Sequence, residues 1–449
     1  MPKLEEFLQS EEETSMREAF DEQVQDILEN EDKYRKEYDH PKVGLEVEYP
    51  AVDRNLDPIT EETRNKIIDP FEYAVPEIGA TQVEIKTDPI EPSRLEDLED
   101  ALENRESNIV NKAKSENVNI LRTGTNPFVD MDNIEKTTDP KYERVPGFHD
   151  RHRNGVVPES FGKKETVDPR NADIAALINS TQLNIEADSF EDAVDKANYT
   201  YMITPYLCAV SANSRFIDGK DTGYADTRMP LWEKSHDLRT EDRLEEDVDA
   251  GKMSSYYDDL KDYLGRVRSE PFIIHEEVAA LDIGIGTYWK DSRIKFRDEN
   301  EEDIHDIIVE SRAISTQPTL EDETAMHGFV LGRLAYAQNV EEELMDIEKV
   351  NRNRYSAMYN GLDTKLYTPE GDLEDAEKVL EKELEKAEKG LEYCNVEDDG
   401  YLDILYNRLD EGVPSAQIAE EFYSRKENES NTHEAMEKAL KSQDAVLGE

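Results

Sequence analysis

The chain has 449 residues, and its 107 Asp and Glu residues against 53 Lys and Arg residues give a formal net charge of −54 at pH 7. This acidic balance argues against nucleic acid and anionic membranes as partners, because like charges repel. The two cysteines, Cys208 and Cys394, lack the spacing of metal ligands. Neither a disulfide framework nor a zinc site is therefore indicated.

Low hydropathy combined with a high net charge is typical of disordered chains. Here, however, apolar residues recur between the acids at helical and strand periods, and the chain contains 21 Tyr and 12 Phe residues. We therefore expect a folded protein whose acidic surface is adapted to molar salt, where a Debye length of about 3 Å screens self-repulsion. The acidic N-terminus and the lack of any run of about 18 apolar residues predict a cytoplasmic location.

Three parts of the chain are predicted. Residues 1–40 are highly charged and predict a helical arm, because apolar residues recur at helical spacing: Leu4, Phe7, Leu8, Phe20, Val24 and Leu28. Residues 41–368 are the predicted main domain. In residues 369–449, a stripe that includes Leu380, Leu384 and Leu391 predicts acidic helices packed on the main domain.

Four segments of the main domain alternate polar and apolar residues, as strands with one buried face do. They are residues 42–53, 81–86, 180–188 and 307–315. Their polar faces carry Glu46 and Glu48, then Glu84, then Gln182 and Asn184, then Glu310 and Arg312. Because strands and helices are mixed without strict alternation, the pattern favours an α+β fold with an antiparallel sheet.

If these strands belong to one sheet, their polar faces form a basin lined by carboxylates. Mg²⁺ is bound in proteins by a few carboxylates together with substrate phosphates. The chain has neither a GxxxxGK[ST] loop nor a GxGxxG loop, so a nucleotide would be held through metal and side chains. The alternative is a solvated face, because Glu-x-Glu arises by chance in so acidic a chain, and Arg312 would then form a surface ion pair worth about 0–1 kcal/mol.

Several motifs resemble those of the glutamate–cysteine ligase family, in the branch shared by bacterial carboxylate–amine ligases and plant-type enzymes. The opening G-x-E-x-E strand is matched by Gly44, Glu46 and Glu48, and the E-x-R strand by Glu310 and Arg312. The most specific match is the block from Ala212-Asn213-Ser214 to Arg228 and Trp232. The similarity runs from about residue 43 to about residue 422. It implies a curved antiparallel sheet with helices packed outside, the glutamine synthetase-like catalytic fold, over residues 41–368.

The resemblance also implies roles for individual residues. Metal binding is expected of Glu46, Glu48, Glu84, Gln182 and Glu310, with Glu77 as a further candidate. Arg312 would contact the transferring phosphate, and Arg228 a glutamate carboxylate or a phosphate. Substrate contacts are expected of Asn184, Asn213, Tyr224, Trp232 and Arg151. Gln182 departs from the His of bacterial members, but a Gln oxygen can still bind Mg²⁺.

The function implied is an ATP- and Mg²⁺-dependent ligase that joins the γ-carboxylate of glutamate to the amine of cysteine through a γ-glutamyl phosphate, a step of glutathione biosynthesis. Two alternatives stay open: another amine as acceptor, or a paralog that binds glutamate or nucleotide without turnover. Two interpretations stay open for a basic cluster: binding of phosphate or glutamate, or local ion pairs. The cluster consists of Arg144, His149, Arg151, His152 and Arg153. The expected partners are small molecules, and homo-oligomerisation is left open.

Overall fold

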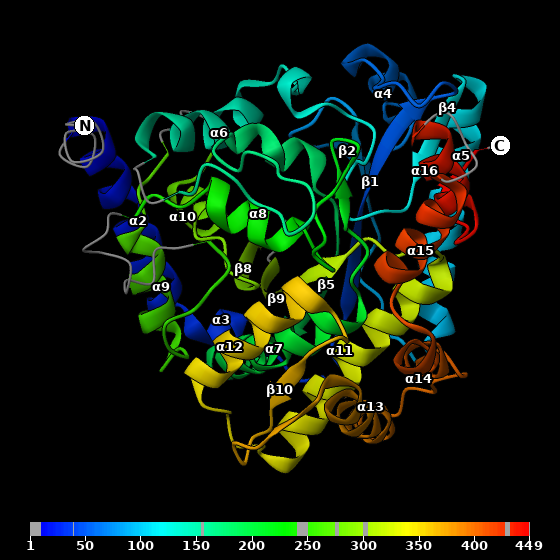
Figure 1. Ribbon diagram of the computed structural model, residues 1–449. Coiled ribbons are helices and arrows are strands. Elements are labelled where there is room, and N and C mark those ends of the chain that lie inside the picture. Colours follow the sequence, from blue (N-terminus) through cyan, green and yellow to red (C-terminus); the bar gives the residue numbers. More distant parts are fainter. Residues whose placement is uncertain are drawn as a thin grey trace.

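The computed structural model describes residues 10–38, 40–153, 157–239, 250–273, 278–299, 304–426 and 432–448. Leu4, Phe7 and Leu8 of the predicted helical arm lie outside the described residues. The remaining residues form a curved sheet with helices on both of its sides (Figure 1). Among the described residues, no helix is both long and apolar enough to cross a membrane.

The central sheet has eight strands, all paired antiparallel, in the order β12-β4-β1-β5-β9-β8, with β3 paired to β1 and β2 to β3. Its strands are β1 (Val43–Asp53), β2 (Ala74–Pro76), β3 (Gln82–Lys86), β4 (Val118–Leu121), β5 (Ser180–Ala187), β8 (Ser292–Glu299), β9 (Ile304–Ser315) and β12 (Val446–Leu447). Two short hairpins are formed by β6 (Phe216–Ile217) with β7 (Lys220–Asp221) and by β10 (Lys365–Tyr367) with β11 (Leu373–Asp375). The four predicted strands and the α+β class are confirmed.

Strand register places the predicted polar residues on one face of this sheet. In β1, Val43, Leu45 and Val47 are each at most 1% exposed, so the alternate residues Glu46 and Glu48 point to the opposite face. Cross-strand partners then lie side by side. The pairs are Glu48 with Glu84, Glu46 with Gln182, and Asn184 with Glu310.

Helices cover both faces of the sheet, and the described helices are α2 (Glu11–Glu29), α3 (Glu31–Tyr34), α4 (Glu61–Ile68), α5 (Glu96–Ser115), α6 (Pro140–His152), α7 (Phe190–Val210), α8 (Arg228–Ser235), α9 (Leu260–Ser269), α10 (Ala280–Thr287), α11 (Leu320–Val340), α12 (Ile347–Asn360), α13 (Ala376–Tyr393), α14 (Leu402–Glu411), α15 (Pro414–Lys426) and α16 (Thr432–Lys441). Short 3₁₀ turns span Met131–Asn133 and Ala172–Leu177. The long, almost wholly buried helices α7 and α11 lie on the apolar face, and α6 and α8 lie on the other (Figure 1). Helices α6 and α8 thus cover the polar face of the sheet.

Both described ends of the chain pack on the body of the protein. Helix α2 contacts α9 and α10, and its Phe20 is 1% exposed with its ring 5.1 Å from that of Phe272. At the other end, β12 pairs with β4 and so extends the main sheet. The boundaries predicted after residues 40 and 368 stay predictions.

Candidate active site

The polar face of the sheet forms the floor of a cavity of about 310 Å³. Its walls come from α6, α8 and the segment around α10. Seven of the predicted site residues line it: Glu46, Glu48, Glu84, Gln182, Arg228, Trp232 and Arg312. The further candidate Glu77 lines it as well. Residues that are up to 266 positions apart in the sequence, such as Glu46 and Arg312, therefore meet in one cavity.

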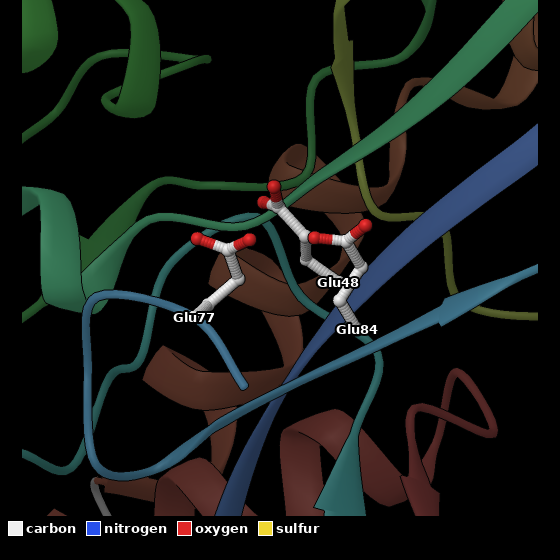
Figure 2. A group of neighbouring side chains, drawn as sticks. All are labelled: Glu48, Glu77 and Glu84. Carbon is white, nitrogen blue, oxygen red and sulfur yellow. The ribbon is translucent and has the colours of Figure 1, made fainter. Parts of the chain in front are cut away.

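Three carboxylates form a cluster at one end of this floor. One oxygen from each of Glu48, Glu77 and Glu84 lies within 4.8 Å of the other two. Figure 2 shows Glu48 and Glu84 on adjacent strands, with Glu77 approaching from the loop that follows β2. The side chain of Glu48 is held by Ser180, whose backbone N–H donates to Oε2 at 2.7 Å, and by Gln182, whose Nε2 donates to Oε1 at 3.2 Å.

Burial and mutual repulsion make this cluster costly to ionise. Burial, together with the charge of Glu84, raises the pKa of Glu48 to about 7 and that of Glu77 well above its ordinary value. Burial also raises the pKa of Glu84. A bound cation would relieve this repulsion, and three carboxylates are the donor set that Mg²⁺ accepts. The residues at this position therefore fit the expected metal ion.

A second group of charges lies beside the first, around Glu46 and Glu310. The buried carboxylate of Glu310 contacts Arg293 at 2.8 Å, Lys295 at 2.6 Å and Arg312. Glu46 Oε1 accepts hydrogen bonds from Asn184 Nδ2 at 3.0 Å and from Lys295 Nζ at 3.3 Å. Burial opposes ionisation of both acids, but Lys295 and Lys86 lower the pKa of Glu46 to about 2. Arg293, Lys295 and Arg312 hold the pKa of Glu310 well below its ordinary value.

Several buried donors around the cavity have no acceptor. Among the described residues, no hydrogen-bond partner exists for Nε of Arg228, Arg293 and Arg312 or for Nε1 of Trp232. A buried donor without a partner costs about 1–3 kcal/mol, so such groups normally meet a ligand or water. Three guanidinium groups and an indole N–H together indicate an anionic ligand, a carboxylate or a phosphate.

Aromatic rings form part of the wall of the cavity. The ring of Trp232 stacks on His236 with centroids 4.0 Å apart, and Arg312 lies 5.0 Å from the centroid of Trp289. Burial lowers the pKa of His149 to about 4 and that of His236 well below its ordinary value. Both histidines are therefore neutral at pH 7, and the positive charge of the cavity comes from its arginines and lysines.

Three residues predicted to bind substrate lie elsewhere. Asn213 donates from Nδ2 to the carbonyl oxygens of Arg122 and Thr316, at 3.0 and 2.7 Å. Tyr224 packs between Phe161 and Tyr359, and Arg151 is exposed on α6. None of the three lines the cavity. Their substrate contacts stay predictions, without support from this arrangement.

A second cavity, of about 510 Å³, lies farther along the same sheet face. Asn184 and Glu186 of β5 and Asp306 and Ile308 of β9 contribute to it, in register with the residues of the first cavity. Its cations are Lys33, Lys36, Lys42 and Arg297, and its acids are Glu186 and Asp306, both of which contact Lys36. Four cations against two acids leave an excess of positive charge, which is unusual in a chain with a net charge of −54 and favours an anionic ligand.

Sequence reasoning missed Arg293 and Lys295, although a signal was present. In residues 292–297, Arg293, Lys295 and Arg297 alternate with Ile294 and Phe296, as on a strand with one buried face. Glu77 was a candidate through the family resemblance alone, because it follows a strand of only three residues and reaches the cluster from a loop, where no periodic signal exists.

Comparisons with known proteins identify the family of the chain. A family model described as glutamate-cysteine ligase family 2 matches residues 42–442. Proteins named as candidate glutamate–cysteine ligases 2 from Rhodopirellula baltica and Chloroflexus aurantiacus are 26% and 27% identical over 201 residues, which is 43% and 42% of this chain and 48% and 44% of theirs. The matched region thus spans less than half the length of these curated relatives.

Two solved structures share the fold. Glutamate–cysteine ligase from Francisella tularensis, in complex with AMP, has a TM-score of 0.57 at 14% identity, over 92% of this chain and 90% of that one. A bifunctional glutathione synthetase from Pasteurella multocida has a TM-score of 0.54 at 12% identity, over 90% and 53%. These likenesses confirm the predicted fold. Because the family model matches nearly all of the chain, the protein is a member of glutamate–cysteine ligase family 2.

Proposed function

We propose that the protein is an ATP-dependent ligase that joins the γ-carboxylate of L-glutamate to the amine of L-cysteine. The observation that carries this proposal is the set of groups on one sheet face. A basic cavity, a cluster of cations around Glu310, and a cavity that holds both the cluster of carboxylates and the unpartnered donors lie on this face. Two anionic substrates that react with each other need such an arrangement.

The nucleotide is assigned to the second cavity. Its lysines and Arg297 suit a polyphosphate, and it shares strands β5 and β9 with the first cavity. A nucleotide bound there would direct its terminal phosphate toward Arg293, Lys295 and Arg312, which meet at Glu310. The AMP in the Francisella tularensis relative supports a nucleotide as a ligand of this fold.

Glutamate is assigned to the first cavity. Arg228 and Trp232 present buried, unpartnered N–H groups there, and a carboxylate is a matching acceptor. Mg²⁺ held by Glu48, Glu77 and Glu84 would neutralise phosphate oxygens during the transfer. Arg312 faces the same space and stabilises the negative charge that develops on the transferring group.

The reaction then has two steps. An oxygen of the γ-carboxylate attacks the terminal phosphorus of ATP, ADP leaves, and a γ-glutamyl phosphate forms. The amine of the acceptor attacks the carbonyl carbon, loses a proton, and phosphate departs with the former carboxylate oxygen. The protein's share is to hold both anions in contact and to exclude water from the acyl phosphate.

The test is ADP release in molar KCl with Mg²⁺ and glutamate, with cysteine or other amines, and mass detection of the product. Cysteine-dependent ADP together with γ-glutamylcysteine is the expected result. Glutamate-dependent ADP with a different product would replace cysteine by another acceptor. The lack of ADP under every condition would leave a paralog that binds its ligands without turnover.

A further inference from the structure

Two of the residues predicted to bind metal, Glu46 and Glu310, have their oxygens occupied by the protein's own donors. Lys295 Nζ lies 2.6 Å from Glu310 Oε1 and 3.3 Å from Glu46 Oε1, so a single ammonium group bridges a carboxylate of β1 and one of β9. The remaining oxygens accept from other cations. Glu310 Oε2 contacts Arg293 and Arg312, and Glu46 Oε2 contacts Lys86 at 3.3 Å.

The pair of Glu46 and Glu310 differs from the neighbouring carboxylate cluster in the number of cations that contact it. Two carboxylates, Glu46 and Glu310, face the cations of Arg293, Lys295, Arg312 and Lys86. The three carboxylates of Glu48, Glu77 and Glu84 are in contact with one of these cations, Lys86, which lies 2.7 Å from Glu84. A divalent cation is therefore attracted to the cluster of three and repelled from the pair.

We propose that Lys295 holds the place of a divalent cation between Glu46 and Glu310, so that the ligand-free protein binds a metal ion at Glu48, Glu77 and Glu84 and excludes one from the pair. This inference rests on the proposed function only in taking the two clusters as parts of one phosphoryl-transfer centre. A metal ion can join Glu46 and Glu310 only after Lys295 has moved to another anion. The phosphates of a bound nucleotide are such an anion, so Lys295 acts as a positioning residue that couples the second metal position to the nucleotide.

The experiment counts tightly bound Mn²⁺ by electron paramagnetic resonance, at one fixed KCl concentration and without nucleotide or amino acid. The wild type is expected to bind one ion per chain. Lys295→Met, which keeps an unbranched side chain one atom shorter and removes its charge, is expected to bind a second ion at least about tenfold more tightly than the wild type does. Lys295→Gln gives the same result if the methionine variant does not fold.

Two matched variants locate the second ion. The double variant Lys295→Met with Glu310→Gln removes a carboxylate of the pair and is expected to lose the ion that Lys295→Met gained. Lys261→Met removes a positive charge from an exposed residue of α9 and is expected to bind as the wild type does. Equal Mn²⁺ counts in the wild type and both Lys295 variants would overturn the proposal, as would a second ion that survives in the double variant. The Mn²⁺ counts are measured without substrate, so they do not depend on catalysis. A protein that releases no ADP would therefore contradict the proposed function and leave this inference to be decided by the counts.

Discussion

Arg228 donates a hydrogen bond from Nη2 to the backbone carbonyl oxygen of Arg312, 3.2 Å away. This contact joins the start of α8 to strand β9. Among the described residues, neither guanidinium group has a partner for its Nε. The two arginines that the sequence predicts to be catalytic are thus fixed to one another with donors left free, as a site for two anionic groups requires.

Replacement of Arg228 tests the assignment of glutamate. Arg228→Lys keeps the charge but loses the planar donor pair that a carboxylate accepts. We expect the KM for glutamate to rise at least about tenfold, a loss of about 1.4 kcal/mol, with the KM for ATP nearly unchanged. The control is Arg215→Lys, from the same sequence block, because Arg215 pairs with Asp221 outside the cavity. Equal effects of both variants on glutamate would remove Arg228 from the binding site.

Glu77→Gln tests the carboxylate cluster in two directions. The raised pKa of Glu77 in the folded state means that its burial is unfavourable at pH 8, where the unfolded chain is ionised. The metal-free variant is therefore expected to be more stable than the wild type. The rise in Tm on adding Mn²⁺ is expected to shrink, because a ligand is lost.

Thermal unfolding with and without Mn²⁺ measures both effects, and the exposed neighbour Glu72 supplies the control variant Glu72→Gln. A metal-dependent rise in Tm that is as large in Glu77→Gln as in the wild type would show that Glu77 does not bind the ion.

Helix α2 is expected to be needed for the stability of the fold. Phe20→Ala removes a buried ring from the contact with Phe272 and should lower the free energy of unfolding by about 3–5 kcal/mol. Urea denaturation measures this loss, with the exposed Glu22→Ala as control. A change below about 0.5 kcal/mol, the range of surface substitutions, would mean that residues 10–38 form a separate arm.

The stability of the protein in acid should depend on His327. Burial lowers the pKa of this histidine to about 3, while its ordinary value is 6.5. Between these values the unfolded chain holds a proton that the folded chain lacks, so stability falls as pH drops below 6.5, by up to about 1.4 kcal/mol per pH unit.

His327→Gln removes this titration while leaving a group that can hydrogen-bond Thr181, which lies 2.7 Å from His327 Nε2. The free energy of unfolding of the variant should fall less steeply than that of the wild type between pH 6.5 and pH 4. Parallel pH profiles would contradict the assignment of a neutral, buried His327.

Strand periodicity predicted the floor of the site, because the alternation of one buried and one polar face is a local property. Glu46, Glu48, Glu84 and Gln182 could be placed on one face from spacing alone once their strands were assumed to pair. The role of Lys295 could not be predicted in this way. It depends on the pairing of β8 with β9, which brings Lys295 beside Glu310 across the sheet.

Asn213 and Tyr224 were predicted to bind substrate, but neither lines the cavity. They belong to the most specific motif of the chain, yet their side chains hold the backbone at Arg122 and Thr316 and pack on Tyr359. A sequence motif identifies residues that occur together in a family, but it does not show which of them contact the ligand. The distinction needs the geometry, in which Arg228 and Trp232 face the cavity.

The central claim, that the γ-carboxylate of glutamate is phosphorylated in this site, is tested most directly with glutamate labelled with ¹⁸O in that carboxylate. Incubation with ATP, Mg²⁺ and the acceptor amine should yield inorganic phosphate that carries one ¹⁸O atom, because phosphate leaves with the former carboxylate oxygen. Phosphate without label, released together with ADP and product, would contradict an acyl phosphate intermediate and with it this account of the site.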